Sequence, residues 1–427
     1  MEIGFFCNMN LVTHKAFAAW RYANFRLYMV ARLTLTMGII MQSVITGWMV
    51  YLYTKDAFML GLTGLAEAIP AIAVGLYAGY LADKYHRKKI ILTSLLFLIL
   101  SSVCITYINF HEHYYYTKFG VVPLFAFTFC VGISRGFLAS ATNAMSAGLV
   151  PLEVLPNMIS WNTTAWYIGA IAGPAIGGIV YNNYNAGYVS LLYTLLMVIA
   201  FVSYVFLKIP AATHTLTQSW FLSFKEGVVY LKQNKILLGA ITLDLLAVMF
   251  GDAIVLLPAF AATVLNIDAA TTGWLRAAPA VGSIVMATWL AFHPPVNNTG
   301  RKLLFSVACF GFAMIAFGLS DSFMLTYIIL ALAGMFDTVS VIVRNIILQT
   351  TTHDSMRGRV ASINSIFIGS SNEIGAFVAG SMAKMFTLQA SVVLGGCITV
   401  FVVLLMWRIV PELKKYNQLE KSQNVSE

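Results

Sequence analysis

The chain has 427 residues, of which 59% are hydrophobic and only 10% are charged. Soluble domains average about 45–50% apolar and about 25% charged residues, so this composition excludes a soluble protein and indicates an integral membrane protein. The net charge of +9 would suggest nucleic-acid binding in a soluble protein, but here the distribution of Lys and Arg between loops explains it better. The five cysteines are scattered and lie mostly in apolar segments, which indicates neither a disulfide framework nor a metal site.

Long apolar segments predict an all-α protein with twelve membrane-spanning helices, since about 20 residues suffice for one crossing. The expected spans are 27–53, 58–82, 89–108, 119–148, 157–181, 187–208, 236–261, 269–292, 302–321, 323–350, 359–384 and 387–409. The polar stretch between the sixth and seventh spans carries apolar residues at helical spacing, which predicts a helix on the membrane surface. The predicted organisation is a six-helix half at 1–209, a linker at 210–235, a second six-helix half at 236–410 and a tail at 411–427.

Basic residues are concentrated on one side of these spans. With the N-terminus in the cytoplasm, nineteen of the 26 Lys and Arg residues fall in cytoplasmic segments, and only Lys55, Lys118 and Lys384 fall outside. This asymmetry predicts a multi-pass protein of the plasma membrane, or of the inner membrane in a Gram-negative bacterium, with both termini in the cytoplasm. The segment between the third and fourth spans, with HEH at 111–113, is expected to be a solvated outer loop rather than a metal site.

The two halves repeat each other. GLAEAIPA at 64–71 aligns without gaps with GWLRAAPA at 273–280, at an offset of 209 residues. Parallel repeats of six spans are one organisation of secondary transporters, which place the substrate site between the halves at mid-membrane depth. The alternative is a chance match between two apolar helices, and the position of the match in the second span of each half argues against it.

The charged stretch GYLADKYHRKK at 79–89 lies between two apolar runs. It follows the pattern G-x-L-A-D-[RK]-x-x-R-[RK] and so resembles the signature between the second and third spans of the major facilitator superfamily. The resemblance implies the two-half, twelve-helix fold of that superfamily and a conformational latch formed by Gly79, Asp83 and Arg87. Physically, a glycine permits close helix packing, and the two charges suit a helix N-terminus and a carboxylate partner. The alternative is that the charges only end a helix and set the topology.

A second motif, GAIAGPAIGG at 169–178, resembles the fifth-span signature of the antiporters of this superfamily. The matching positions are Gly169, Gly173, Pro174, Gly177 and Gly178. Glycines at this spacing form a smooth stripe for close helix packing, and the proline bends the span. The resemblance implies that this packing seals the outer side of an antiporter, whereas tight packing without that role is the alternative.

Further segments, among them NFRLYMVARL, GWMVYLYT and RGRVASINSIFIGSSNEIGAFVAG, are similar to the branch of the superfamily that includes the enterobactin exporter and macrolide-efflux proteins. This similarity covers nearly the whole chain. It implies transport, and it says less about the molecule that is transported.

Charged residues near the middle of the expected spans are the candidates for a substrate or coupling cavity. They are Glu67, Arg135, Asp252, Arg276, Asp337 and Glu373, and Gln42 adds a neutral hydrogen-bonding position. Lipid exposure would cost each charge about 2.5–3.5 kcal/mol on insertion scales, so they are expected to face the interior. Ion pairing between helices is the alternative role. Arg32, Asp244 and Arg344 lie nearer the cytoplasmic ends, where they could reach water by snorkelling, and are therefore expected to have structural roles.

The function predicted from these features is secondary active export of a partly apolar small organic molecule, such as a siderophore or drug, in exchange for protons. Glu67 and Asp252 are the preferred coupling residues. The chain lacks a phosphate-binding G-x-x-x-x-G-K-[ST] loop, and its seven histidines fall outside the expected spans, so neither an enzyme nor a cofactor or metal site is predicted. The protein is expected to act as a monomer. A solute importer and a membrane receptor without transport are the alternatives.

Overall fold

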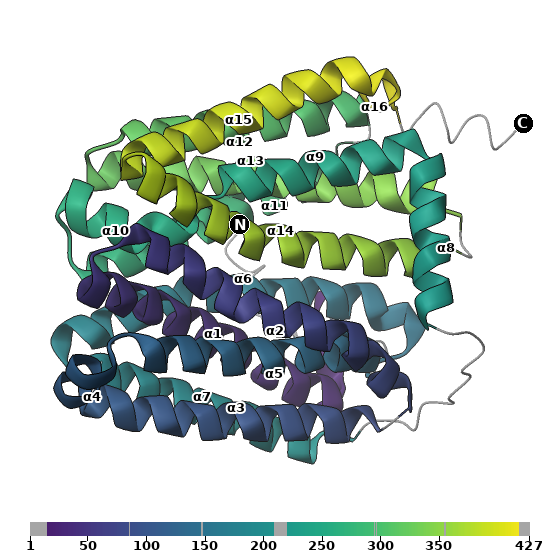
Figure 1. The fold of residues 1–427 in the computed structure, drawn as a ribbon. Helices are drawn as coiled ribbons and strands as arrows, with labels where there is room; N and C mark the ends of the chain where they lie inside the picture. The colour runs from purple at the N-terminus through teal and green to yellow at the C-terminus, as the bar shows by residue number, and fades with distance from the viewer. Residues whose placement is uncertain are drawn as a thin grey trace, which may run out of the picture.

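The structure, a computed structural model, describes residues 15–417 except 85, 147, 209–219, 294, 296 and 354–355. Throughout this part of the chain the regular structure is helical. Eleven of the described helical segments are long and apolar enough to cross a membrane. The all-α, two-half membrane fold expected from the sequence is confirmed, and its helices form two stacked layers (Figure 1).

The N-terminal half follows a short helix η1 (Lys15–Arg21). Its spans are α1 (Ala23–Thr54), α2 (Ala57–Lys84), α3 (Arg87–Phe110), α5 (Val122–Ser146), α6 (Leu155–Asn183) and α7 (Ala186–Phe206), with η2 (Leu152–Val154) preceding α6. The C-terminal half contains α9 (Lys235–Gly251), η3 (Ile254–Leu256), α10 (Leu257–Phe260), η4 (Ala261–Leu265), α11 (Ala269–Phe292), α12 (Thr299–Leu319), α13 (Phe323–Thr351), α14 (Arg357–Met385) and α15 (Leu388–Ile409).

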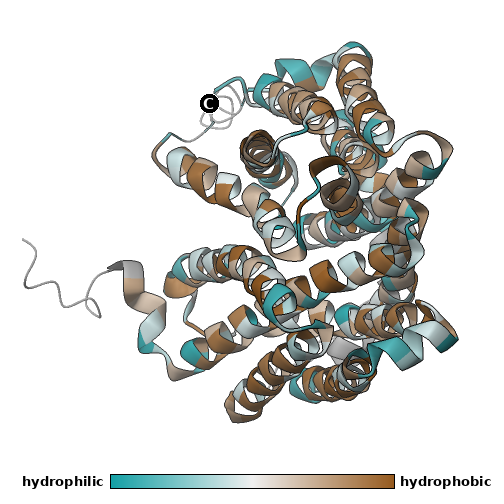
Figure 2. Ribbon diagram, turned by 90° about the vertical axis from the view of Figure 1, so that its left-hand side faces the viewer, coloured by the Kyte–Doolittle hydropathy of each residue, from teal (hydrophilic) through white to brown (hydrophobic). Residues whose placement is uncertain are grey.

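Short helices distinguish the two ends of the bundle. Helix α4 (Glu112–Phe119) lies at one end, called here the α4 end. Helices α8 (Trp220–Gln233) and α16 (Pro411–Lys415) lie at the opposite end, called the α8 end, where α8 runs across the ends of the spans (Figure 1). Seen from the α4 end, the helices of the two halves form two groups in which hydrophobic residues predominate (Figure 2).

Helix α14 occupies the place of the eleventh expected span, 359–384. It is 29 residues long, which is enough to cross a bilayer. Its sequence contains several serines, glycines and a central Asn-Glu pair, so it is less apolar than the eleven segments named above. A polar helix in such a bundle must turn its polar side to the protein interior.

The seventh span is broken, whereas the sequence pattern predicted a continuous helix at 236–261. Helix α9 ends at Gly251, and Asp252 has extended dihedral angles of φ −81° and ψ 94°. The carboxylate of Asp252 accepts a hydrogen bond from the N–H of Ile254 at 3.1 Å, and Pro258 begins the next helical turn without an N–H to donate. Hydropathy could not reveal the break because both pieces are apolar.

The segment between the third and fourth spans forms a short helix rather than an irregular loop, and His111 and His113 in it are exposed, as expected of a solvated segment. Tyr116 of α4 is only 4% exposed. Its hydroxyl donates to Oδ1 of Asn109, and its ring lies 4.7 Å from the ring of Tyr53. Burial raises the pKa of Tyr116, which keeps the phenol neutral and able to donate. Helix α4 therefore packs onto the bundle.

Backbone contact between α11 and α13 sets one wall of the interior. A Cβ atom on Gly282 would lie 1.8 Å from the carbonyl oxygen of Ala331, and one on Gly334 would lie 2.0 Å from that of Pro279. Only glycine permits this approach. The contact brings the polar positions of these two helices to the same interior surface.

Asp244 and Arg344 form an ion pair between α9 and α13. The Arg344 side chain is 2% exposed, so it pairs inside the bundle instead of snorkelling to water, in the structural role expected of it. A buried charge at this position needs a partner of opposite sign, because desolvation costs several kcal/mol per ion. The pair holds α9 and α13 together toward the α8 end of the C-terminal half.

We expect Asp244→Asn to lower the free energy of unfolding by about 3–5 kcal/mol, because it leaves the Arg344 charge buried without its partner. The double variant Asp244→Leu/Arg344→Met should recover most of this loss. Unfolding of the purified protein by titration with a denaturing detergent measures both. Glu412→Gln, which breaks the exposed Lys235–Glu412 pair at the same end, is the control and should unfold like the parent. Equal stability of Asp244→Asn and the parent would contradict a structural role for the pair.

Candidate functional site

A cavity of about 740 Å³ lies between the two halves, and residues from both line it. The structure places all six mid-span charges in its wall: Glu67, Arg135, Asp252, Arg276, Asp337 and Glu373. They come from α2, α5, the break in the seventh span, α11, α13 and α14. A cavity of this size suits a drug-sized organic molecule.

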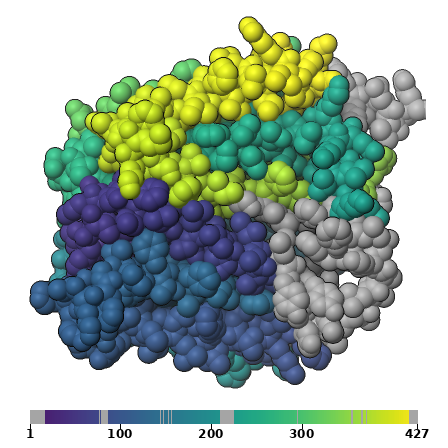
Figure 3. All heavy atoms as spheres, in the orientation of Figure 1, coloured from purple at the N-terminus to yellow at the C-terminus, as the bar shows by residue number. Residues whose placement is uncertain are grey.

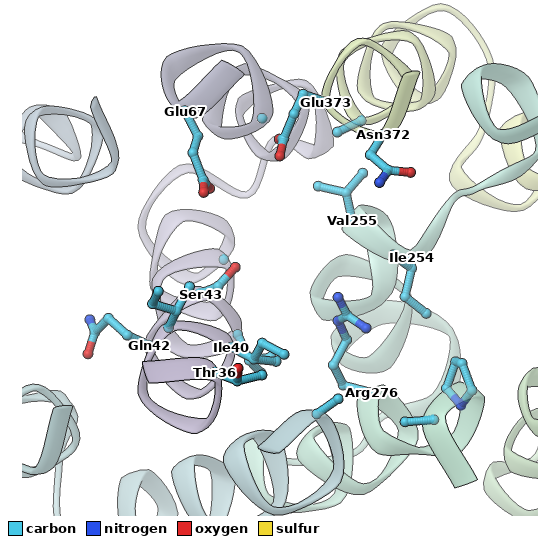
Figure 4. A pocket seen from close by; sticks show the side chains of 18 of the residues that line it. Thr36, Ile40, Gln42, Ser43, Glu67, Ile254, Val255, Arg276, Asn372 and Glu373 are labelled. Atoms are coloured by element: carbon cyan, nitrogen blue, oxygen red, sulfur yellow. The ribbon is translucent and has the colours of Figure 1, made fainter. Parts of the chain in front are cut away.

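Arg135 joins the two halves electrostatically. Its guanidinium forms an ion pair with Glu67 of α2, and Nη1 lies 3.2 Å from Oε1 of Glu373 on α14. The two acids lie side by side at the edge of the same open space (Figure 4). Sequence reasoning anticipated pairing, but it could not show that one arginine serves an acid from each half.

A second group of charges lies in the C-terminal half. Asp252 is close enough to Arg276 to interact with it electrostatically, and Asp337 is close enough to Asp252. Among the described residues, no carboxylate lies within 4 Å of the Arg276 guanidinium, and Asp337 forms no ion pair. The side chain of Arg276 projects into the cavity (Figure 4). These charges face the cavity without the direct pairing that Arg135 has.

Gln42 belongs to a hydrogen-bond network inside the N-terminal half. It is 2% exposed, and its Oε1 accepts from the hydroxyl of Ser190 at 3.2 Å. Ser190 in turn accepts from Nδ2 of Asn109 at 2.8 Å, which links Gln42 to Tyr116 of α4. The amide points away from Glu67 and Arg276 in Figure 4. Although Gln42 contributes to the cavity wall, its polar atoms hold helices together.

The halves meet through glycines at the α4 end. A Cβ atom on Gly61 of α2 would lie 3.0 Å from Cα of Gly380 on α14, and one on Gly273 of α11 would lie 2.3 Å from the carbonyl oxygen of Pro174 on α6. The purple N-terminal and yellow-green C-terminal helices meet at this end in Figure 3. Contacts of backbone on backbone close the space between the halves there.

At the α8 end the same helices separate. A Cβ atom on Gly75 of α2 or on Gly369 of α14 would have no atom of the described residues within 4 Å. Helices α2 and α14 diverge toward α8 in Figure 1. The structure is therefore closed at the α4 end and open between these helices at the α8 end.

The glycine motif on α6 packs against two helices. Gly169, Gly173 and Gly177 face Thr36, Met37 and Met41 of α1 in the same half. Gly178 and Pro174 instead meet α11 of the opposite half, at Ala269 and Gly273. Three motif residues thus hold the N-terminal half together, and two lie in the contact between the halves.

The proposed latch falls largely outside the described side chains. The backbone of Gly79 and Asp83 is helical within α2, but the Asp83 side chain and the surroundings of Gly79 are not described. Arg87 is the first residue of α3. The latch role of these three residues stays a prediction.

Arg32 is a cavity residue that sequence reasoning placed near water instead. It lies on α1 with Tyr28, Leu35, Thr36 and Ile39 in the cavity wall. These positions recur every three or four residues, so a helical face containing Arg32 was the signal that could have found it.

The chain is similar to known transport proteins over nearly its whole length. A sequence profile of the family described as transmembrane secretion effector matches residues 14–426. The enterobactin exporter of Shigella flexneri is 25% identical over 92% of this chain and 93% of its own length, and that of Citrobacter koseri is 27% identical over 92% and 93%.

Solved structures share the fold at low identity. A D-xylose–proton symporter superposes with a TM-score of 0.73 at 15% identity, covering 93% of this chain and 100% of the symporter. The inward-open xylose transporter of E. coli superposes with a TM-score of 0.69 at 14% identity, covering 94% and 99%. At these identities the likeness establishes the fold only.

We expect Arg135→Gln to loosen the closure at the α4 end, because it removes the cation that holds Glu67 and Glu373 together. Arg135 is 45% exposed, so the loss should be about 1 kcal/mol, a change of about fivefold in the ratio of two conformers. Spin labels at Tyr184 and Met385, which are exposed at the α4 end on opposite halves, measure the separation by pulsed electron resonance. Lys118→Gln, at an exposed α4 position, is the control. An unchanged distance distribution in Arg135→Gln would show that the bridge does not hold the halves.

Proposed function

Because the chain belongs to the transmembrane secretion effector family of the major facilitator superfamily, we propose that this membrane transporter exports a small organic molecule in exchange for protons. The carrying observation is the cavity between two halves that touch at one end, in which Arg135 binds a carboxylate from each half. Alternating access needs such a central site with contacts that break and re-form around it.

The orientation of the bundle supports export as the direction of transport. Lys55, Lys118 and Lys384, the basic residues assigned to the outside, lie at the α4 end of α1, in α4 and in the last turn of α14. The positive-inside rule then makes the α8 end cytoplasmic. The conformer described here would take up substrate from the cytoplasm, as an exporter must before release outside. The related enterobactin exporters support a substrate of siderophore or drug type.

Proton coupling would use the Arg135 bridge. When Glu67 and Glu373 are both ionised, each attracts the guanidinium, and α14 is held against the N-terminal half. A proton bound to either acid removes its charge and weakens that attraction. Opening toward the outside would expose the acid to protons. The halves would then close at the α4 end with the proton still bound, and its release toward the cytoplasm would leave an ionised acid with which the bridge re-forms.

Asp252 is the second coupling candidate because it lies at the break in the seventh span. Its carboxylate holds the turn by accepting the N–H of Ile254, and it faces Arg276 in the cavity. Discontinuous spans form the ion and substrate sites of many transporters. Protonation there would weaken both the turn and the attraction to Arg276.

The energy available matches the task. One elementary charge moving inward through a 100 mV potential supplies about 2.3 kcal/mol. Since about 1.4 kcal/mol corresponds to a tenfold ratio, one proton would support a substrate gradient of a few tens-fold. One coupling carboxylate is therefore sufficient for useful export.

We expect at least one of Glu67→Gln and Asp252→Asn to abolish proton-driven accumulation in sealed inverted vesicles while leaving substrate exchange at zero gradient. A neutral side chain of the same size keeps the cavity but cannot exchange a proton. Flux of a candidate siderophore or drug with and without a pH gradient is the measurement, and Asp321→Asn, an exposed acid between α12 and α13, is the control.

Three outcomes would change the proposal. If both variants concentrate substrate like the parent, neither residue is the coupling site. Movement of substrate in the same direction as protons would identify an importer. Absence of any flux with a broad substrate panel would favour a receptor without transport.

We expect a membrane-impermeant thiol reagent applied to intact cells to label a cysteine at Asn182, at the α4 end of α6, and not one at Gln233, at the end of α8. Both positions are exposed, and the variants would be built in a background without the five native cysteines. Permeabilised cells are the control for reactivity, since both positions should then react. Labelling of Gln233→Cys alone in intact cells would invert the orientation and with it the direction of transport.

A further inference from the structure

Arg32 differs from the two other arginines of the cavity because no acid lies near it. Arg135 binds two carboxylates, and Arg276 has Asp252 within electrostatic range. Within the part of the chain that the structure describes, no carboxylate lies within 4 Å of Arg32, and its buried Nε has no hydrogen-bond partner. A guanidinium held in a protein wall without an anion is costly, so this position is suited to an anion that arrives from elsewhere.

Two tyrosines lie within electrostatic range of this guanidinium. Tyr28 of α1 and Tyr204 of α7 lie close enough to Arg32 to interact with it electrostatically, and all three line the cavity. The hydroxyl of Tyr28 is held in place because it donates to Oδ1 of Asn162 at 3.0 Å. The cavity wall near Arg32 on the side of the N-terminal half is therefore aromatic, and one of its tyrosines is held by a hydrogen bond.

Trp166 of α6 lies at about the same depth as Arg32. Both α1 and α6 run from the α8 end, and two contacts give their register: Tyr28 meets Asn162, and Gly169 packs on Thr36. Positions 32 and 166 fall between these contacts. Trp166 lines the cavity and is 42% exposed, so its ring offers a stacking surface in the same cavity at about the depth of the guanidinium.

The candidate coupling acids lie at a different depth in the membrane from Arg32. Arg32 is nine residues from the start of α1 at the α8 end, whereas Glu67 is ten residues from the start of the antiparallel α2 at the α4 end. With a rise of about 1.5 Å per residue, Arg32 lies about 14 Å from the α8 end and Glu67 about 15 Å from the α4 end. The two helices are about 40–50 Å long. An anion at Arg32 would therefore be kept apart from these acids.

We propose that Arg32, with Tyr28, Tyr204 and Trp166, binds an aromatic carboxylate group of the transported molecule. The planar guanidinium can donate two hydrogen bonds to one carboxylate, and the attached ring would stack on Trp166 while the rest of the molecule fills the cavity. This inference rests on the proposed transport function and adds the chemical class of the substrate. Arg32 lies nearer the α8 end, from which a cytoplasmic substrate would enter.

Equilibrium binding to the purified full-length protein in lipid nanodiscs tests the subsite without a proton gradient. The probes are 3-hydroxy-2-naphthoate and its amide, 3-hydroxy-2-naphthamide, which share the ring and differ in the charged group. The variants are Arg32→Gln, Arg32→Lys and, as a control, Arg408→Gln, an exposed arginine of α15. Isothermal titration gives the affinity of each protein for both probes, and empty nanodiscs give the background.

The parent should bind the acid about tenfold or more tightly than the amide, since a charge-assisted hydrogen bond typically contributes about that factor. Arg32→Gln should remove the preference while its affinity for the amide stays within about twofold, which also shows that it is folded. Arg32→Lys should keep only part of the preference because an ammonium cannot form the paired hydrogen bonds. Arg408→Gln should behave like the parent.

The proposal is overturned if the parent shows no preference for the acid, or if the preference survives in Arg32→Gln. If Arg32→Gln does not fold, a full preference in Arg32→Lys would overturn the paired geometry and a reduced one would support it. Because the assay needs no flux, failure of proton-driven export in vesicles would leave this result standing. Conversely, loss of the subsite would leave proton-coupled export untouched.

Discussion

The membrane interior excludes unpaired charge, and the arrangement of this bundle follows from that constraint. Six charged side chains occur near the middle of its spans, and all of them line one cavity between the halves. The one further buried pair, Asp244 with Arg344 among the described residues, is neutralised within the C-terminal half. Each helix that carries one of these charges must therefore turn it inward, and the glycine contacts allow the helices to approach closely enough to enclose those positions. The cavity is thus a consequence of where the charges occur along the chain.

The break in the seventh span shows that the same constraint applies to the backbone. Freed N–H and C=O groups are tolerated at membrane depth only where they are bound or face a cavity. Here the carboxylate of Asp252 accepts one freed N–H, from Ile254, and both residues line the cavity. The residue that carries a charge into the site therefore also stabilises the irregular turn that presents it. Protonation of Asp252 would alter the backbone geometry as well as the local charge.

The sequence was sufficient for the fold class and for the list of interior charges, because hydropathy and the cost of a charge in lipid act on one helix at a time. It was insufficient wherever the outcome depended on a neighbour. Nothing local distinguishes Arg135, which binds two acids, from Arg276, which binds none directly. The same limit applies to Arg344, whose partner lies on another helix, and to Tyr116, whose hydroxyl binds Asn109. Gln42 was left open between two roles for the same reason, and its bond to Ser190 resolves the placement of its amide.

The two acids of the Arg135 bridge lie on α2 and α14, the same two helices whose glycines meet at the α4 end. On α2, Gly64 lies one helical turn from Glu67, and a Cβ atom on Gly64 would lie 3.2 Å from the carbonyl oxygen of Glu373. On α14, Glu373 lies seven residues before Gly380, which packs against Gly61; that is about 10 Å along the same helix. Because both helices move as rigid rods over so short a distance, the glycine contacts cannot separate while Arg135 still holds both acids. Opening at the α4 end therefore requires the Arg135 bridge to break first.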